Sequence, residues 1–199
     1  MIQLFMKRSG SPVIVPLNLP ASQSAIAEAS CQLDEASREG KTRIVEIKSV
    51  IANLPSYLSG FDPDSRTQLA QLNRLASIIA QMDSRERNIY AGALDGNGIN
   101  DLNDMIRVAE QVSDYILIPN VNSDVTLGRY VAVAGQIQGD PRFPEAAWPY
   151  LDFSKIGAEY YAEHGGAYTS APRYAGRKRA GGWQNRIWAN LDQSGCDDW

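Results

Sequence analysis

One histidine, His164, is the only side chain of this sequence that ordinarily acts as a general base near neutral pH. It stands directly before a Gly-Gly pair at a predicted helix end, where a histidine more often stabilises the helix C-terminus than performs catalysis. The sequence has no GxSxG, P-loop, HExxH or dinucleotide-binding glycine motif. Asp101, Asp104 and Glu110 would suit a metal-dependent nuclease only if they converged on one site. We therefore expect a binding protein, not an enzyme, with no cofactor and no metal.

The cysteines and the lengths of the apolar runs indicate the cellular compartment of the protein. Cys31 and Cys196 lie far apart and have no CxxC or Cys/His companions, which argues against a zinc site and a disulfide framework. No apolar run approaches the roughly 20 residues that span a bilayer. The chain starts with a very short apolar segment followed by Lys7 and Arg8, the reverse of a secretory signal. We therefore expect a cytoplasmic protein that does not associate with membranes.

Acidic residues are concentrated in the middle and later part of the chain. The whole sequence has a net charge of only −4, but residues 95–163 contain eleven acidic and four basic side chains, a local balance of −7. Such an asymmetry indicates a charged partner. The acids that we consider candidate partner contacts are Asp101, Asp104, Glu110, Asp114, Asp124, Asp140, Glu145, Asp152, Glu159 and Glu163.

Hydrophobic periodicity predicts an α+β fold made of consecutive small pieces, and 199 residues with 44% hydrophobic content suffice for one domain or for two or three small ones. Residues 1–61 predict an N-terminal α+β domain. A helix is expected from Ser22 or Ser24, as N-cap, to about Ala36. Strands are expected at 2–6, 13–17 and 43–48, the first two forming a hairpin around the turn at 9–12.

Residues 62–113 show helical spacing and predict a helical domain. The first helix is expected to have Asp62 as its N-cap and Pro63 at its first position. The segment from Asp83 to Glu86 has the pattern of a capping box and starts a second helix. Apolar residues at helical spacing after residue 101 predict a third helix, with its acids facing solvent.

Residues 114–170 predict a C-terminal α+β domain. A like-charged pair at helical spacing by itself costs a few tenths of a kcal/mol, and Glu159 and Glu163 form such a pair one turn after Lys155. We expect this face to meet a partner; a solvated face partly balanced by Lys155 is the alternative. The expected elements are a strand at 115–118 stopped by Pro119 and two helices with Ser123 and Ser154 as N-caps, the second ending at Gly165.

Residues 171–199 predict a basic, tryptophan-containing tail. Pro172 to Gly182 has the composition of a linker, and one short amphipathic helix follows it. The tail either docks its tryptophans on the body of the protein or forms a contact element for nucleic acid or an acidic partner. Its candidate contact residues are Arg173, Arg177, Lys178, Arg179, Trp183, Arg186 and Trp188.

An ordered series of short motifs resembles the ArdA-type antirestriction proteins of mobile genetic elements. The series covers roughly residues 12–170 in the order of the family, and the LGRY and YLDFxxIG steps match best. The motifs are Val15–Ser22, Leu72–Ala76, Leu102–Ile106, Tyr115–Pro119, Leu127–Tyr130 and Tyr150–Gly157, with Gly165 and Gly166 after them.

This resemblance implies a non-enzymatic inhibitor that mimics DNA. ArdA proteins are elongated molecules of three small domains in a row, usually paired into a curved homodimer. Their surface carboxylates imitate the phosphates of bent duplex DNA and occupy the DNA groove of type I restriction-modification enzymes. The implied partner is a host defence nuclease complex in the bacterial cytoplasm, and direct DNA binding is not expected. The preferred phosphate stand-ins are Asp124, Asp152, Glu159 and Glu163.

Two features favour alternatives. The net charge of −4 is milder than that of a typical DNA mimic, and the basic tail has no counterpart in the family. The scaffold would then be an anti-CRISPR protein that blocks the nucleic-acid channel of a CRISPR effector complex. The tail would otherwise make the chain a nucleic-acid-binding module. A nuclease that binds metal through Asp101 and Asp104 is the third alternative.

Overall fold

The computed structural model describes residues 1–37, 40–96, 99, 101–133, 145–164, 166–168 and 173–177. Its contacts divide the chain into two compact units, unit 1 (residues 1–94 and 98–113) and unit 2 (residues 95–97 and 114–199). Helices occur together with two three-stranded sheets, in agreement with the predicted α+β class. The further division of unit 1 into an α+β and a helical domain stays a prediction. In the described part of the chain, every helix is too short or too polar to span a bilayer.

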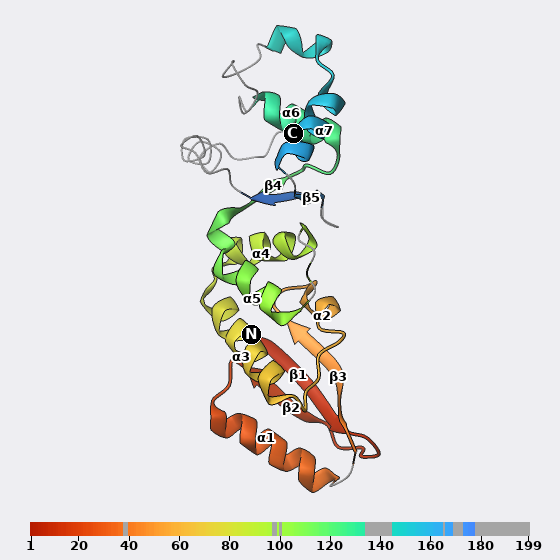
Figure 1. Cartoon of the computed structure of the whole chain (residues 1–199), viewed down its shortest axis with the longest axis vertical. Helices are drawn as coiled ribbons and strands as arrows, with labels where there is room; N and C mark the ends of the chain where they lie inside the picture. The colour runs from red at the N-terminus through yellow and green to blue at the C-terminus, as the bar shows by residue number, and fades with distance from the viewer. Residues whose placement is uncertain are drawn as a thin grey trace. The chain divides into compact units, whose positions relative to one another are not determined.

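The sheet of unit 1 has the order β2-β1-β3 and is antiparallel on both sides of its central strand (Figure 1). Its strands are β1 (Ile2–Arg8), β2 (Val15–Leu19) and β3 (Thr42–Ser49). Leu4 lies opposite Leu17 and Ile47, so the apolar residues of the three strands share one face. The predicted hairpin is therefore confirmed, with small shifts of the strand ends.

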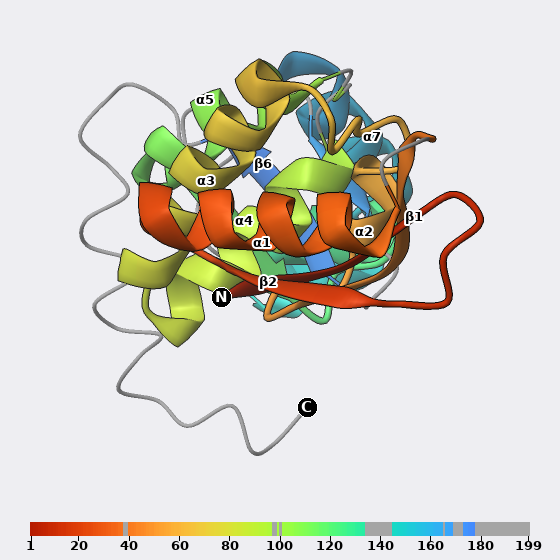
Figure 2. The same ribbon diagram turned by 90° about the horizontal axis from the view of Figure 1, so that it is seen from below.

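Helix α1 (Gln23–Ala36) packs against the β1–β2 hairpin (Figure 2). The Ser22 hydroxyl oxygen accepts the amide of Ala25 at 3.2 Å, which confirms Ser22 as the N-cap. Ala29 and Leu33 are buried on this helix, and Ile2, Leu4 and Met6 are buried on β1. The inner face of the sheet thus packs against α1, and α3 also contacts this sheet through β2.

The helical part of the chain follows the sheet. Leu72, Leu75 and Ile79 are completely buried on α3, which packs against α5. The predicted capping box of α4 is confirmed, because Asp83 accepts the amide of Glu86 at 2.7 Å and Glu86 accepts the amide of Asp83 at 3.0 Å. The elements are α2 (Leu54–Tyr57), α3 (Arg66–Gln81), α4 (Ser84–Gly96), α5 (Leu102–Glu110) and the short 3-10 helix η1 (Val112–Asp114).

The predicted start of α3 is wrong. Ser65 is its N-cap and accepts the amide of Gln68 at 3.4 Å. Asp62 instead accepts the amide of Asp64 at 3.1 Å, which closes a turn before the helix. The helix therefore begins three residues later than the Asp-Pro pattern indicates.

Asp64 ties this turn to β3. Its two carboxylate oxygens accept the Thr42 hydroxyl at 2.6 Å and the Thr42 amide at 2.9 Å, and the Arg8 guanidinium lies 3.5 Å away. Partial burial by itself would raise the pKa of Asp64. The hydrogen bonds from Thr42, with smaller contributions from Arg8 and Lys41, nevertheless hold this pKa below its ordinary value of 3.8. The fold therefore stabilises the ionised form.

We expect Asp64→Asn to lower the free energy of unfolding of unit 1 by about 1–2 kcal/mol at neutral pH, because an amide cannot accept both Thr42 hydrogen bonds. Since the folded pKa is lowered, the stabilisation is present above the ordinary pKa of 3.8 and is lost as the pH falls through the folded value. Urea unfolding followed by circular dichroism at neutral and acid pH measures both effects.

The difference in unfolding free energy between the Asp64→Asn variant and the unsubstituted protein should therefore become smaller at acid pH. Glu35→Gln, on the exposed side of α1, is the control and should not change the unfolding free energy at neutral pH. A destabilisation by Asp64→Asn that is the same at neutral and acid pH would contradict the assignment.

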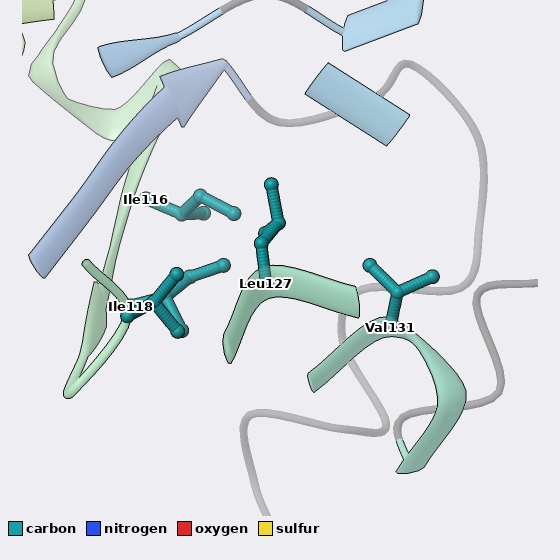
Figure 3. Packing of buried hydrophobic residues seen from close by; sticks show 5 residues of the cluster. Ile116, Ile118, Leu127 and Val131 are labelled. Atoms are coloured by element: carbon teal, nitrogen blue, oxygen red, sulfur yellow. The ribbon is translucent and has the colours of Figure 1, made fainter. Parts of the chain in front are cut away.

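The sheet of unit 2 has the order β4-β6-β5 and is antiparallel throughout. Ile116, Ile118, Val121, Leu127 and Val131 form its buried core, with β4 and α6 contributing the side chains that Figure 3 labels. Tyr130, Ile156, Tyr160 and Tyr168 pack against this core. The elements are β4 (Tyr115–Pro119), α6 (Asp124–Val133), the 3-10 helix η2 (Glu145–Tyr150), α7 (Phe153–His164), β5 (Ala167–Tyr168) and β6 (Arg173–Arg177).

Strand β6 corrects the predicted linker at 172–182. It is the central strand of its sheet, where Ala175 is buried and lies opposite Leu117 of β4. The sequence of β6 contains a glycine and no β-branched residue, so its own strand propensity is low. It becomes a strand because it pairs with β4, which lies far earlier in the sequence, and with β5, which has only two residues.

Of the two N-caps predicted for unit 2, one is confirmed and one is wrong. Ser123 accepts the amide of Thr126 at 3.4 Å and precedes α6, as predicted. Ser154 is not the cap of α7, because that helix already begins at Phe153. Asp152 takes this role and accepts the amide of Lys155 at 3.1 Å.

Two glycines allow α6 and α7 to pack with their backbones in contact. A Cβ atom on Gly157 would overlap with the carbonyl oxygen of Asp124, and one on Gly128 would overlap with the carbonyl oxygen of Phe153. Only glycine permits this approach. Because these glycines belong to the LGRY and YLDFxxIG motifs, both motifs have a structural role in this helix crossing.

Candidate functional site

The predicted contact acids of α5 have partners inside unit 1. Asp101 is the N-cap of α5 and accepts the amide of Asp104 at 2.9 Å. Asp104 in turn accepts the Arg107 guanidinium at 2.7 Å, and Glu110 pairs with Arg74 of α3. These carboxylates cap α5 and connect it to α3, so their charges are partly offset within the unit.

Two of the preferred phosphate stand-ins of unit 2 also serve the fold. The Tyr168 hydroxyl donates to Asp124 at 2.6 Å, which links α6 to β5. Asp152 caps α7 and is exposed. Asp114 is exposed at the end of η1. These positions keep acid at the surface, but replacing Asp124 or Asp152 would also disturb a hydrogen bond.

Helix α7 presents the two remaining stand-ins on its exposed side. Glu159 has 66% of its side chain exposed, and Glu163 is exposed in the last turn. Lys155 lies 4.0 Å from Glu159, an exposed pair that contributes little stability. Glu163 is unfavourably placed twice, because it follows a like charge by one turn and lies near the negative end of the helix dipole. Glu163 therefore does not stabilise α7 by its own charge.

Sequence reasoning did not single out the exposed aromatic side chains of unit 2. Tyr150 is 88% exposed, and Tyr161 is 38% exposed and stacks on Tyr168 with ring centroids 5.7 Å apart. Exposed tyrosines are frequent in protein–protein interfaces. The sequence signal for these side chains is the density of tyrosine between residues 150 and 168.

The described residues contain no group of three or more His, Cys, Asp or Glu side chains that could hold a metal ion. Burial raises the pKa of Tyr90, whose hydroxyl donates to the Met105 carbonyl at 3.3 Å. Burial, with the nearby Tyr160, also raises the pKa of Tyr130. Both tyrosines thus stay protonated and belong to the interior.

An open hollow of about 560 Å³ lies in unit 1 between the loop that joins α2 to α3 and the start of α5. Its amide side chains are engaged with the protein, since Gln71 donates to Asn103 at 2.7 Å and Gln68 accepts the Asp62 amide at 2.8 Å. Asp101, the only carboxylate among the described residues that line it, caps α5. These described lining residues include no histidine, lysine or arginine that could act as an acid–base partner for Asp101.

Part of the predicted surface is not covered by the structure. Arg173 and Arg177 form the two ends of β6, and Glu145 begins η2, but the description does not extend to these three side chains or to that of His164. The predicted contacts that lie outside the described residues are Asp140, Lys178, Arg179, Trp183, Arg186 and Trp188.

Comparison with known proteins adds no family. No protein-family model matches the chain, and a search of curated proteins finds no match. The resemblance to ArdA-type proteins therefore rests on the order of the motifs alone.

Proposed function

We propose that the protein is a non-enzymatic inhibitor of the ArdA type that acts in the bacterial cytoplasm. Its acidic surface would mimic DNA and occupy the DNA-binding groove of a host type I restriction-modification enzyme. The observation that carries the proposal is the exposed pair Glu159 and Glu163 on α7, which is unfavourable for the helix itself. A homodimer, implied by the same resemblance, belongs to the proposal.

The physical basis is the attraction of a basic groove to fixed carboxylates. Residues four apart on a helix are separated by about 6 Å along its axis, so α7 holds Glu159 and Glu163 at regular spacing. A groove that binds DNA through lysine and arginine would meet these carboxylates with the contacts that it makes to phosphates. The ionised acids of α5, which are paired within unit 1, contribute less to this attraction.

The double variant Glu159→Gln and Glu163→Gln is expected to reduce protection against restriction by about tenfold or more, because two charge contacts to a basic groove are lost. Plating efficiency of unmodified phage on cells with a type I restriction system measures protection. The variant should fold normally, since removing the like-charged pair favours α7.

Glu28→Gln with Glu35→Gln is the matched control. Both acids are exposed on α1 of unit 1, and their removal changes the net charge equally. If the unsubstituted protein fails to protect against type I restriction, or if both double variants lose protection equally, the proposed site on α7 is wrong.

An anti-CRISPR protein on the same scaffold is the second candidate, favoured by the mild net charge of −4. It differs from the first only in the complex that it blocks, so capture from a host lysate followed by identification of the bound complex separates the two. A nucleic-acid-binding module that uses the basic tail predicts instead direct, salt-sensitive binding of duplex or single strands through that tail, which the acidic surface of a mimic should not show.

A further inference from the structure

The outer face of the unit 1 sheet, opposite the face that packs against α1, is open to solvent. Along β1 the side chains alternate between buried and half-buried positions, so Gln3, Phe5 and Lys7 point to this outer face. Phe5 lies at its centre, with exposed Pro16 and Glu46 as its neighbours on β2 and β3. The face thus presents an aromatic ring in the middle strand of a three-stranded sheet.

Positive charge surrounds this ring. Lys7 lies directly opposite Arg43 in the strand pairing, so two cations share one row of the outer face. Like charges in this position destabilise a sheet, and within the described part of the chain no carboxylate forms an ion pair with either. Lys48 adds a third cation, and the Glu46 carboxylate lies 3.7 Å from it. The row of Lys7 and Arg43 is suited to an anion.

The present contact of the Phe5 ring is one that a ligand can replace. The Lys48 ammonium lies over the Phe5 ring, 4.9 Å from its centroid. A cation–π contact at an exposed site is weak in comparison with the stacking of a nucleobase on an aromatic ring. A base could therefore take the place of the ammonium, which would then be free to meet a phosphate.

We infer that this outer face, made of Gln3, Phe5, Lys7, Arg43, Glu46 and Lys48, binds single-stranded nucleic acid. One base stacks on Phe5, and the adjacent phosphates contact the cations of the Lys7–Arg43 row and Lys48. A single strand fits better than a duplex, because only unpaired bases expose their faces to a side chain on a sheet. An acidic peptide would satisfy the cations but would leave the ring without a stacking partner.

This inference does not depend on the proposed inhibitor function. The acidic pair lies on α7 of unit 2, whereas the outer face belongs to the sheet of unit 1. The expectation that a mimic binds no DNA concerns its acidic surface, whereas the present inference concerns the basic outer face of the unit 1 sheet and single strands alone.

Fluorescence anisotropy with labelled oligouridylate and oligothymidylate of about twelve nucleotides tests the inference on the full chain. We expect binding that weakens with salt, and Lys7→Gln with Arg43→Gln should reduce the slope of log K against log salt by about 1.4, for two phosphate contacts. Phe5→Leu keeps an apolar side chain but removes the ring, and it should weaken binding about tenfold. Thermal unfolding by circular dichroism verifies that these variants fold.

Arg66→Gln with Lys155→Gln is the control that removes two exposed cations that are not part of this face, on α3 and α7. It should leave the affinity nearly unchanged. Absence of binding at low salt, affinity that Phe5→Leu does not alter, or an equal loss in the control variant would each overturn the inference. Displacement of the oligonucleotide by polyglutamate as readily as by unlabelled oligonucleotide would overturn it too, and would identify an acidic protein segment as the partner.

Discussion

Gly157→Ala is expected to prevent α6 and α7 from packing and to destabilise unit 2 by more than about 3 kcal/mol. Inserting a methyl group into a packed interior costs about 1–3 kcal/mol when side chains can move aside. Here the new Cβ would overlap with the backbone carbonyl of Asp124 and would lie 2.9 Å from the Gly128 nitrogen, so a helix has to shift. Gly128→Ala should behave alike, because its Cβ would overlap with the Phe153 carbonyl.

Urea unfolding followed by tryptophan fluorescence measures this effect, since all four tryptophans lie at position 148 or later in the sequence and Trp148 belongs to η2 of unit 2. Gly60→Ala is the matched control. A Cβ on Gly60 would meet nothing within 4 Å, so this change should be nearly neutral or slightly stabilising. An unchanged urea midpoint for Gly157→Ala would show that the two helices do not cross at these glycines.

Local signals in the sequence predicted the start of several elements. Ser22, Ser123 and the Asp83–Glu86 capping box act through hydrogen bonds to amides only three residues away. Such contacts depend little on the rest of the fold, so the residue types alone indicate them. The same holds for the hairpin, whose two strands are adjacent in sequence.

The start of α3 depends on contacts distant in sequence. Asp62 was predicted as its cap, but the bonds between Asp64 and Thr42, 22 positions apart, hold the preceding turn outside the helix, and Ser65 caps it. Strand β6 was missed for a similar reason. Its partner β4 lies more than fifty residues earlier, and nothing in the composition of Arg173–Arg177 indicates that pairing.

The sequence predicted where the acidic residues of the candidate site lie, but not which side chains they pair with. The sequence indicates which residues are acidic and which of them share a helix face, and α7 presents Glu159 and Glu163 as expected. It does not indicate that Glu110 meets Arg74 or that Asp124 accepts the Tyr168 hydroxyl, because these partners are 36 and 44 positions apart. Charge counted along the chain therefore overestimates the acid that a partner would meet.

Leu4→Ala is expected to destabilise the helices of unit 1 together with its sheet, so that both lose protection from hydrogen exchange. Leu4 is completely buried in the central strand, and replacing such a leucine by alanine costs about 2–5 kcal/mol. Hydrogen bonds join the helices to the segments around the sheet. Asn73 of α3 accepts the Ala21 amide at 2.7 Å and donates to the Ala21 carbonyl at 3.0 Å, and Asn53 donates to the Ala91 carbonyl at 2.8 Å. These links argue for one cooperative unit.

Hydrogen exchange measured by mass spectrometry on peptides from β1, β3, α3 and α5 tests this cooperativity. All four should lose protection by a similar factor of about thirtyfold or more, which corresponds to the lower end of the expected destabilisation. Gln3→Ala is the control on the same strand, since Gln3 points to the outer face. Should α3 and α5 keep their protection while the strands lose it, residues 62–113 would form a domain of their own. That result would support the three-domain arrangement that the resemblance to ArdA-type proteins implies.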